Sequence, residues 1–286
     1  MNMVIGMGAG VGAGSEGGGV EETTEATGTT GTTGTDGMKK ESLAEKRERA
    51  GKIFAALGKE YPGAGCELAS WSTPFELAVA TMLSAQCTDK RVNMVTPGLF
   101  KRYPSVAAFA EARQEELEEV IRSTGFFRNK AKNIRALAAR VRDEFGGELP
   151  SDFEVLVTLP GIGRKTAHLL VAEAFGGAGL VVDTHFIRLS NRLGFAQGTD
   201  ARKVEDALAQ VVPRERWSRW SHLMVFHGRR CCNARKPECG RCVIAGLCPA
   251  KGEGQGGKKA NNGGQAPRTP RRGAKAGGAK RGAGRK

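Results

Sequence analysis

Leu159-Pro160-Gly161-Ile162-Gly163-Arg164-Lys165-Thr166-Ala167 joins two predicted short helices, over residues 152–158 and 165–175. Pro160 prevents the first helix from continuing, and Gly161 and Gly163 permit backbone angles and a close approach that a Cβ would obstruct. Ile162, between the two glycines, can fill the crevice. We therefore expect a tight glycine hairpin whose second helix presents unpaired amide N–H groups to an anion such as a backbone phosphate.

The hairpin places Lys165 in the first turn of the second helix. The positive end of the helix dipole disfavours an ammonium group there, and partial burial would disfavour it further. Both effects favour a neutral, nucleophilic amine. A solvated lysine beside a helix start is the alternative, because most lysines are exposed.

The two ends of the 286-residue chain differ in composition from its middle. Residues 1–37 are rich in Gly and Thr and contain five acidic residues but no Lys or Arg, whereas residues 251–286 contain eleven Lys or Arg and one Glu. Neither end can bury enough apolar surface to offset its ordering entropy, so we expect two disordered tails. The core between them keeps +9 of the total net charge of +14. This excess favours a polyanionic partner over a merely solvated basic surface.

Membrane and secretory segments are not predicted. No run of eighteen apolar residues exists, and the first residues lack the basic flank of a signal peptide and the arginines of a mitochondrial transit peptide. We expect a cytosolic protein. Its seven cysteines, four of them close to residue 240, are then more typical of metal ligands than of disulfides.

The folded region is predicted to be all-helical, because apolar residues recur at intervals of three and four and no segment alternates with period two. Residues 75–83 are apolar on nearly every face and are expected in the centre of a core. Asp89 is expected to cap the helix that follows. Further helices are predicted near 41–61, 90–102, 104–113, 114–123, 134–145, 183–192, 204–211 and from 214 onward.

Cys232, Cys239, Cys242 and Cys248 are separated by six, two and five residues. Four thiolates within seventeen residues can surround one metal centre. Structural zinc usually takes ligands in two close pairs, whereas an iron-sulfur cluster tolerates wider spacing, so the cluster is favoured although spacing alone permits both. Cys231 makes the first ligand ambiguous, and the six-residue gap to Cys239 favours Cys232.

These motifs together resemble the endonuclease III family of bifunctional DNA glycosylases, in the helix-hairpin-helix superfamily. The resemblance runs in order over about residues 40–250 and is highly specific. It includes the hairpin, the four cysteines and three shorter motifs, namely Leu83-Ser84-Ala85-Gln86, Val182-Asp183-Thr184-His185 and His227-Gly228-Arg229.

The resemblance implies a fold and a cofactor. It implies two helical domains flanking a DNA cleft: a six-helix barrel domain at 67–177 that contains the hairpin, and a cluster domain formed by 38–66 plus 178–250. The cofactor would be a 4Fe-4S cluster held by the four cysteines. Residues 1–37 and 251–286 would remain outside both domains as tails.

The resemblance also assigns the chemistry. Lys165 matches the nucleophile and Asp183 the essential carboxylate of the family. An amine that attacks the sugar C1′ forms a Schiff base, which acts as an electron sink for β-elimination. Asp183 could stabilise the oxocarbenium-like sugar or relay protons, although Asp before Thr at a helix start is also an ordinary N-cap.

DNA contacts are implied at several positions. Gln86 matches the residue that enters the space left by the flipped nucleotide, although without the family it is only a polar group at a helix end. Phe126 lies where the family carries an apolar wedge, which is leucine in one known member, so the bulkier phenylalanine is a departure. Core packing of Phe126 or Phe127 is the alternative. His185 and His227 could contact phosphate or pack. The remaining expected contacts are the hairpin residues Gly161, Gly163 and Arg164.

The predicted function is removal of oxidised pyrimidines from duplex DNA in base excision repair, with abasic-site lyase activity. The expected protein is a monomer in the bacterial cytoplasm, associated with the nucleoid through DNA. The basic tail would add nonspecific, salt-sensitive attraction to DNA or act only as a solubilising tail. Rival functions are the related adenine-specific mismatch glycosylase, which lacks a lysine at position 165, and a noncatalytic DNA-binding module.

Overall fold

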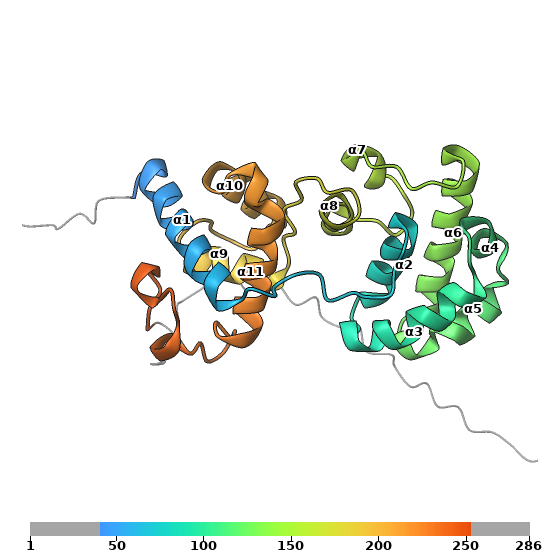
Figure 1. Cartoon of the computed structure of the whole chain (residues 1–286), viewed down its shortest axis with the longest axis horizontal. Coiled ribbons are helices and arrows are strands. Elements are labelled where there is room, and N and C mark those ends of the chain that lie inside the picture. The colour runs from blue at the N-terminus through green and yellow to red at the C-terminus, as the bar shows by residue number, and fades with distance from the viewer. Residues whose placement is uncertain (1–40, 253–286) are drawn as a thin grey trace, which may run out of the picture. The chain divides into compact units, whose positions relative to one another are not determined.

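The computed structural model describes residues 41–252 (Figure 1). Within this range every regular element is helical and no β-strand occurs, as the sequence predicted. No helix in the same range is long and apolar enough to cross a membrane. Both predicted tails lie outside the described residues, apart from Lys251 and Gly252.

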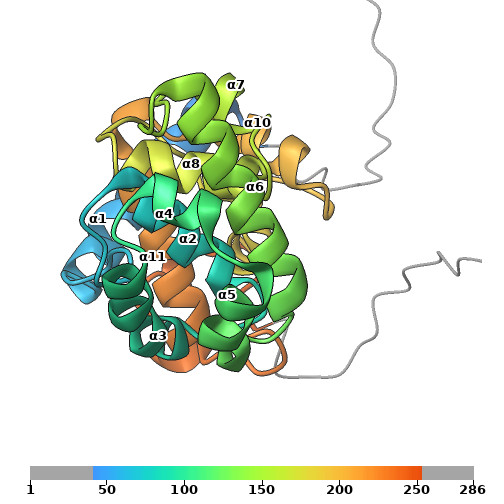
Figure 2. The same ribbon diagram turned by 90° about the vertical axis from the view of Figure 1, so that its right-hand side faces the viewer.

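The described region contains eleven α-helices and four short 3-10 helices. Figure 2 shows α6 running alongside α4 and α5, with which it makes extensive contacts. The helices are α1 (Leu43–Glu60), α2 (Pro74–Ser84), α3 (Asp89–Arg102), α4 (Val106–Glu111), α5 (Gln114–Ile121), η1 (Arg122–Thr124), α6 (Phe127–Phe145), α7 (Phe153–Leu156), α8 (Arg164–Glu173), α9 (Thr184–Arg192), α10 (Ala201–Val211), η2 (Arg214–Arg216), α11 (Trp217–Arg230), η3 (Cys239–Arg241) and η4 (Ala245–Leu247).

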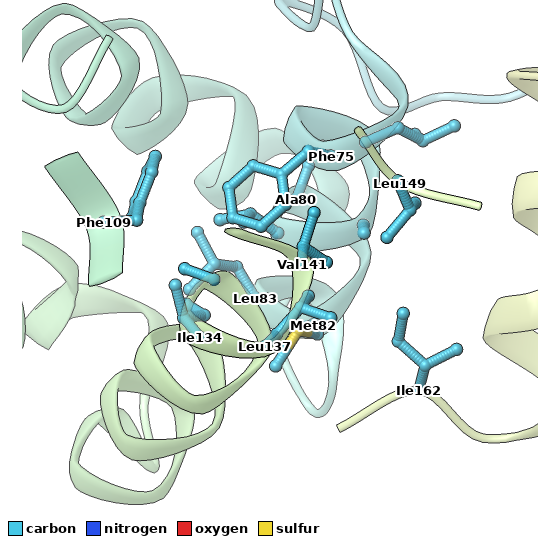
Figure 3. Close-up of a cluster of buried hydrophobic side chains, with 14 of the residues drawn as sticks. Phe75, Ala80, Met82, Leu83, Phe109, Ile134, Leu137, Val141, Leu149 and Ile162 are labelled. Atoms are coloured by element: carbon cyan, nitrogen blue, oxygen red, sulfur yellow. The ribbon is translucent and has the colours of Figure 1, made fainter. Parts of the chain in front are cut away.

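Helix α2 lies in the centre of a first hydrophobic cluster, which runs from Leu68 to Leu170. Its start is fixed by a capping box in which Thr73 and Glu76 exchange hydrogen bonds, followed by Pro74 at the first helical position. Seven of its eleven residues are buried, which confirms the central placement predicted for this segment. Figure 3 shows part of this cluster, with Met82 and Leu83 near Leu137 of α6.

A second hydrophobic cluster joins the beginning of the described chain to its last third. Helix α1 packs against α10 and α11, and α9 packs against α11 (Figure 1). At the centre, Trp220 of α11 is fully buried and stacks on Phe54 of α1 with ring centroids 6.2 Å apart. Residues 50–64 and 180–244 therefore share one apolar core.

Polar contacts connect α8 to helices of the second cluster. Glu205 of α10 accepts a hydrogen bond from Arg164 at 2.6 Å and lies 3.0 Å from His168 Nε2. His222 of α11 lies 2.7 Å from Glu173. Burial opposes ionisation of Glu205, but the hydrogen bonds from His168 and Arg164 outweigh it and lower the pKa of this carboxyl. These contacts hold the hairpin helix against α10 and α11.

Several bounds of the predicted helices are wrong, and the helix predicted near 134–145 already begins at Phe127. Thr88, not Asp89, caps α3, because the Thr88 hydroxyl accepts the N–H of Arg91 at 3.2 Å and Asp89 is already the first helical residue. Helix α7 ends at Leu156 rather than at Thr158, since the chain must turn before Pro160.

Candidate active site and cluster-binding segment

The glycine hairpin lies between α7 and α8, as predicted. Asp152 caps α7 by accepting the N–H of Val155 at 2.9 Å, and Ile162 is 4% exposed within the first cluster. Gly161 has φ +77°, and a Cβ at this position would lie 2.4 Å from Cε of Met82. Glycine thus avoids a strained backbone angle at this position and a contact that would displace the end of the Met82 side chain.

The sequence predicted that Gly163 permits an unusual backbone angle and a close approach, and this prediction is wrong for Gly163. Its φ is −91°, in the extended region, and a Cβ built on it would meet no atom of the described protein within 4 Å. Gly163 is the N-cap of α8 and has no side chain to satisfy the first amide groups of that helix. These amides therefore remain available to an anion outside the protein.

Lys165 is the second residue of α8, and its side chain is exposed. The predicted position in the first turn is confirmed. The partial burial that would further disfavour an ammonium group there is not observed, because the side chain is exposed. The neighbouring Arg164 has its guanidinium engaged within the protein, by Glu205 and by the ring of Phe153 at 4.9 Å from the ring centroid. Lys165 is thus the hairpin cation that points to open space.

Lys165 is one of the residues that line an open depression of about 930 Å³. Arg229 of α11 lies on its edge and forms ion pairs with Glu67 and with Asp89, the latter at 3.4 Å. Met94 of α3 is exposed on its wall. The full lining is Glu67, Ser84, Cys87, Thr88, Asp89, Lys90, Asn93, Met94, Lys165 and Arg229.

Asp183 is the N-cap of α9, so the capping role that the sequence also allowed for it is observed. Its Oδ1 accepts the N–H of Phe186 at 2.7 Å, and within residues 41–252 its Oδ2 accepts no hydrogen bond. The capping role therefore leaves one carboxylate oxygen for other chemistry.

The start of α9 is pressed against the end of α11. A Cβ at Gly228 would lie 2.9 Å from Nδ1 of His185, so only glycine permits this approach. Arg188 donates to the carbonyl of Gly228 at 2.9 Å and to that of Cys232 at 3.0 Å. The residue after Gly228 is Arg229, which shares the depression with Lys165. Arg229 thus links the two regions along the chain, although Asp183 itself does not line the depression that contains Lys165.

Gln86 and Phe126 have unusual backbone angles. Among the described residues only Ser70, Gln86 and Phe126 combine a side chain with positive φ, and the values for Gln86 and Phe126 are +54° and +49°. Both side chains are exposed, and 62% of Phe126 faces solvent. Core packing is therefore wrong for Phe126, whereas Phe127 does pack against the first cluster. Strained, exposed side chains of this kind are typical of functional positions.

The four predicted cysteine ligands lie in and around the last turns of the described chain. Cys239 begins η3, Cys242 and Cys248 follow η3 and η4, and Cys232 follows α11. Arg192 of α9 donates to Sγ of Cys232 at 3.2 Å, a contact that suits an anionic sulfur. Burial is the main cause that raises the pKa of Cys248, and the charges of Cys232, Cys242 and Cys239 raise it further.

The spacing of the sulfurs fits a cluster better than a single zinc ion. Four thiolates on zinc, at about 2.3 Å each, would lie within about 4.6 Å of one another. Among the described residues only His227, Cys231 and Cys242 bring three ligand atoms within 4.8 Å. No three of the four predicted ligand sulfurs lie within this distance of one another, so their arrangement is wider than a zinc site requires.

His227 and Cys231 border this segment. His227 is buried, and burial together with Arg241 lowers its pKa to about 4. The neutral ring can accept from the Tyr61 hydroxyl at Nδ1, 3.1 Å away, and donate from Nε2 to Sγ of Cys242, 3.5 Å away. Burial and the Cys242 thiolate raise the pKa of Cys231 to about 12, so Cys231 remains a thiol. The packing alternative for His227 is thus observed.

Comparisons with known proteins give the family. Residues 79–214 match the model described as "HhH-GPD superfamily base excision DNA repair protein". Residues 232–248, from Cys232 to Cys248, match the "Iron-sulfur binding domain of endonuclease III". The hairpin fold and the cysteine segment thus define a base-excision DNA repair protein of the helix-hairpin-helix superfamily.

Relatives narrow the assignment within that superfamily. Endonuclease III of Synechocystis sp. is 52% identical over 209 residues, which cover 73% of this chain and 95% of the relative. Endonuclease III of Escherichia coli K12 is 40% identical over 200 residues, covering 70% and 94%. A structure described as a trapped endonuclease III-DNA covalent intermediate has 42% identity and a TM-score of 0.69, covering 72% of this chain and 97% of that one. The chain belongs to the endonuclease III family, and its cofactor is a 4Fe-4S cluster, as predicted.

Sequence reasoning gave no role to three residues that shape the site, although Gly228 was already part of a motif shared with the family. Glu205 engages Arg164 and His168, Gly228 permits the contact between α9 and α11, and buried Lys130 donates two hydrogen bonds. A glycine in the middle of an otherwise regular helix could have indicated Gly228. Glu205 and Lys130 gave no local signal, because charged residues at helical spacing normally face solvent.

Proposed function

We propose that Lys165 and Asp183 are the catalytic pair of this chain, which is a bifunctional DNA glycosylase and abasic-site lyase of base excision repair. The observation that supports Lys165 is its exposed side chain at the first turn of α8, inside an open depression. The observation that supports Asp183 is a capping bond that uses only Oδ1.

The chemistry follows from a primary amine. The Lys165 nitrogen lone pair forms a bond to the sugar C1′, and the C1′–N bond to the damaged base breaks, with its electron pair leaving on the base. The C1′–O4′ bond of the sugar then breaks, the ring oxygen takes up a proton, and a protonated Schiff base between Lys165 and C1′ is formed. Removal of a C2′ proton sends electrons toward the iminium nitrogen and expels the 3′ phosphate. Asp183 stabilises the positive charge at the sugar and relays protons.

The DNA contacts are assigned to residues outside the lining of the depression, of which Gln86 and Phe126 are the exposed side chains in left-handed turns. Phe126 is proposed to enter the base stack and Gln86 to fill the space of the flipped nucleotide, since both are exposed in strained turns. The unpaired amides that follow Gly163 at the start of α8 are proposed to hold a phosphate, for which the open space at Gly163 leaves room. Arg164 and His185 would reach DNA only by giving up part of their present contacts.

The substrate is proposed to be an oxidised pyrimidine or an abasic site in duplex DNA, which the protein engages as a monomer. Residues 67–177 and residues 38–66 with 178–250 are proposed as two domains flanking the DNA cleft, in agreement with the two hydrophobic clusters. Cys232, Cys239, Cys242 and Cys248 are proposed to hold the cluster, which orders this segment when bound. The protein is proposed to act in the cytoplasm on nucleoid DNA.

Borohydride trapping on a duplex with one abasic site tests the catalytic assignment. Borohydride reduces the Schiff base to a stable covalent adduct, which wild type should form and Lys165→Ala should not. Lys90→Ala is the matched control, because Lys90 lines the same depression. Equal trapping by wild type and Lys165→Ala, or loss of trapping in Lys90→Ala alone, would contradict the assignment.

A further inference from the structure

Lys130 is a buried lysine for which the catalytic mechanism has no use. It is the fourth residue of α6, at the end of the first turn, and is 6% exposed. Within residues 41–252 no carboxylate pairs with it. Its ammonium instead donates to the carbonyl of Leu83 at 2.7 Å and to the carbonyl of Thr124 at 2.9 Å. Burial lowers the pKa of this group, so the position is costly and needs an explanation.

The bond to Leu83 fixes the end of α2. Leu83 is the penultimate residue of α2, and its carbonyl is one of those that a helix end leaves unpaired. A cation there also suits the negative end of the helix dipole. Gln86 follows three residues later, in a turn closed by the N–H of Cys87 on the carbonyl of Ser84 at 3.0 Å. Lys130 thus anchors the base of the Gln86 turn.

The bond to Thr124 fixes the other strained turn. The backbone N–H of Lys130 donates to the carbonyl of Phe126 at 3.1 Å, while its ammonium holds the carbonyl of Thr124. One residue therefore holds the chain on both sides of Gly125. The left-handed conformation of Phe126 is strained for a residue with a side chain and persists only where its surroundings impose it.

We propose that Lys130 is a positioning residue that sets the distance between the Gln86 turn and the Phe126 turn, so that both side chains enter DNA at the same nucleotide. This inference rests on the DNA contacts in the proposed function. Lys130 is itself too buried to contact DNA, and it acts only through the two turns.

A comparison of duplex and single-stranded substrates separates positioning from chemistry. Lys130→Met keeps the length of the side chain but removes the donor, and Lys132→Met makes the same change at an exposed position of the same helix. On a duplex with an oxidised thymine, we expect Lys130→Met to lower the single-turnover rate about tenfold, equivalent to about 1.4 kcal/mol. On a single-stranded abasic oligonucleotide, where no nucleotide leaves a duplex, the lyase rate should stay within about twofold. Lys132→Met should match wild type on both.

A double-mutant cycle with Phe126→Ala tests whether Lys130 acts through the wedge. In the Phe126→Ala background, Lys130→Met should lower the single-turnover rate on duplex DNA by less than about twofold. The effects of two coupled residues are not additive, so the second change has little left to remove. A 2-aminopurine next to the lesion should also brighten less with Lys130→Met than with wild type, since base unstacking would be incomplete. Should Lys130→Met fail to fold, Lys130→Gln, which retains N–H donors, is expected to give the same pattern with a smaller loss.

Three results would overturn the proposal. They are an equal loss on duplex and single-stranded DNA, a full multiplicative loss in the Phe126→Ala background, and a Lys130→Met enzyme that matches wild type on the duplex. Failure of the proposed function has a separate signature, because wild type would then form no borohydride-trapped adduct at all.

Discussion

Replacing Gly161 by alanine should destabilise the hairpin, whereas the same change at Gly163 should not. At Gly161 the new Cβ would lie 2.4 Å from Cε of Met82 and 3.2 Å from Cβ of Asn133, with φ at +77°. The left-handed angle costs an alanine about 1–2 kcal/mol, and overpacking of a core commonly costs about 1–3 kcal/mol. The flexible end of Met82 can move partly out of the way, so we expect about 3 kcal/mol in total.

Thermal or urea unfolding of the cluster-loaded protein measures this difference. For a chain of this size, about 3 kcal/mol corresponds to a Tm lower by about 6–12 °C. Gly163→Ala, with φ −91° and open space, should cost no more than about 1 kcal/mol, the usual effect of a poorer N-cap. It should nevertheless weaken DNA binding, because its methyl group would occupy the space proposed for a phosphate. Equal stability of the two variants would refute this reading of the hairpin.

Three further outcomes are expected. Asp183→Asn should lower turnover by about 10²-fold or more while DNA affinity and Tm change little, because Asn caps a helix as well as Asp; equal losses of turnover and affinity would reduce Asp183 to its capping role. Cys232→Ser should abolish the visible absorbance of the cluster, whereas Cys231→Ser should retain it, and the reverse result would show that the ligand assignment is off by one residue. The pKa of Glu205 is lowered in the folded protein, so its stabilising contribution is present above its ordinary value of 4.5 and is lost as pH falls through the folded value. The difference in unfolding free energy between wild type and Glu205→Gln, measured from pH 7 to pH 3, should therefore shrink at acid pH, and a difference that grows would contradict the sign.

Local patterns in the sequence predicted a large part of the fold. Helix spacing predicted the all-helical architecture, and the buried run at 75–83 predicted the central helix of the first cluster. Gly161 and Asp183 were predictable because a tight turn and a helix start impose local requirements that few residue types meet.

Contacts between distant segments could not be predicted in this way. Lys130 meets the carbonyl of Leu83 across 47 positions, and Arg164 meets Glu205 across 41. A charged residue in an amphipathic helix has the same pattern whether it faces solvent or a buried carbonyl. The choice between Phe126 and Phe127 also needed the structure, because a left-handed turn exposes one ring and packs the next.

Mass-spectrometric mapping of the reduced protein-DNA adduct is the most direct measurement of the central claim. After borohydride reduction and proteolysis, the deoxyribose remnant should be found on the peptide that contains Lys165, and on that lysine alone. A remnant on Lys90, on another lysine or on the N-terminal amine would contradict the claim that Lys165 forms the covalent bond to the sugar.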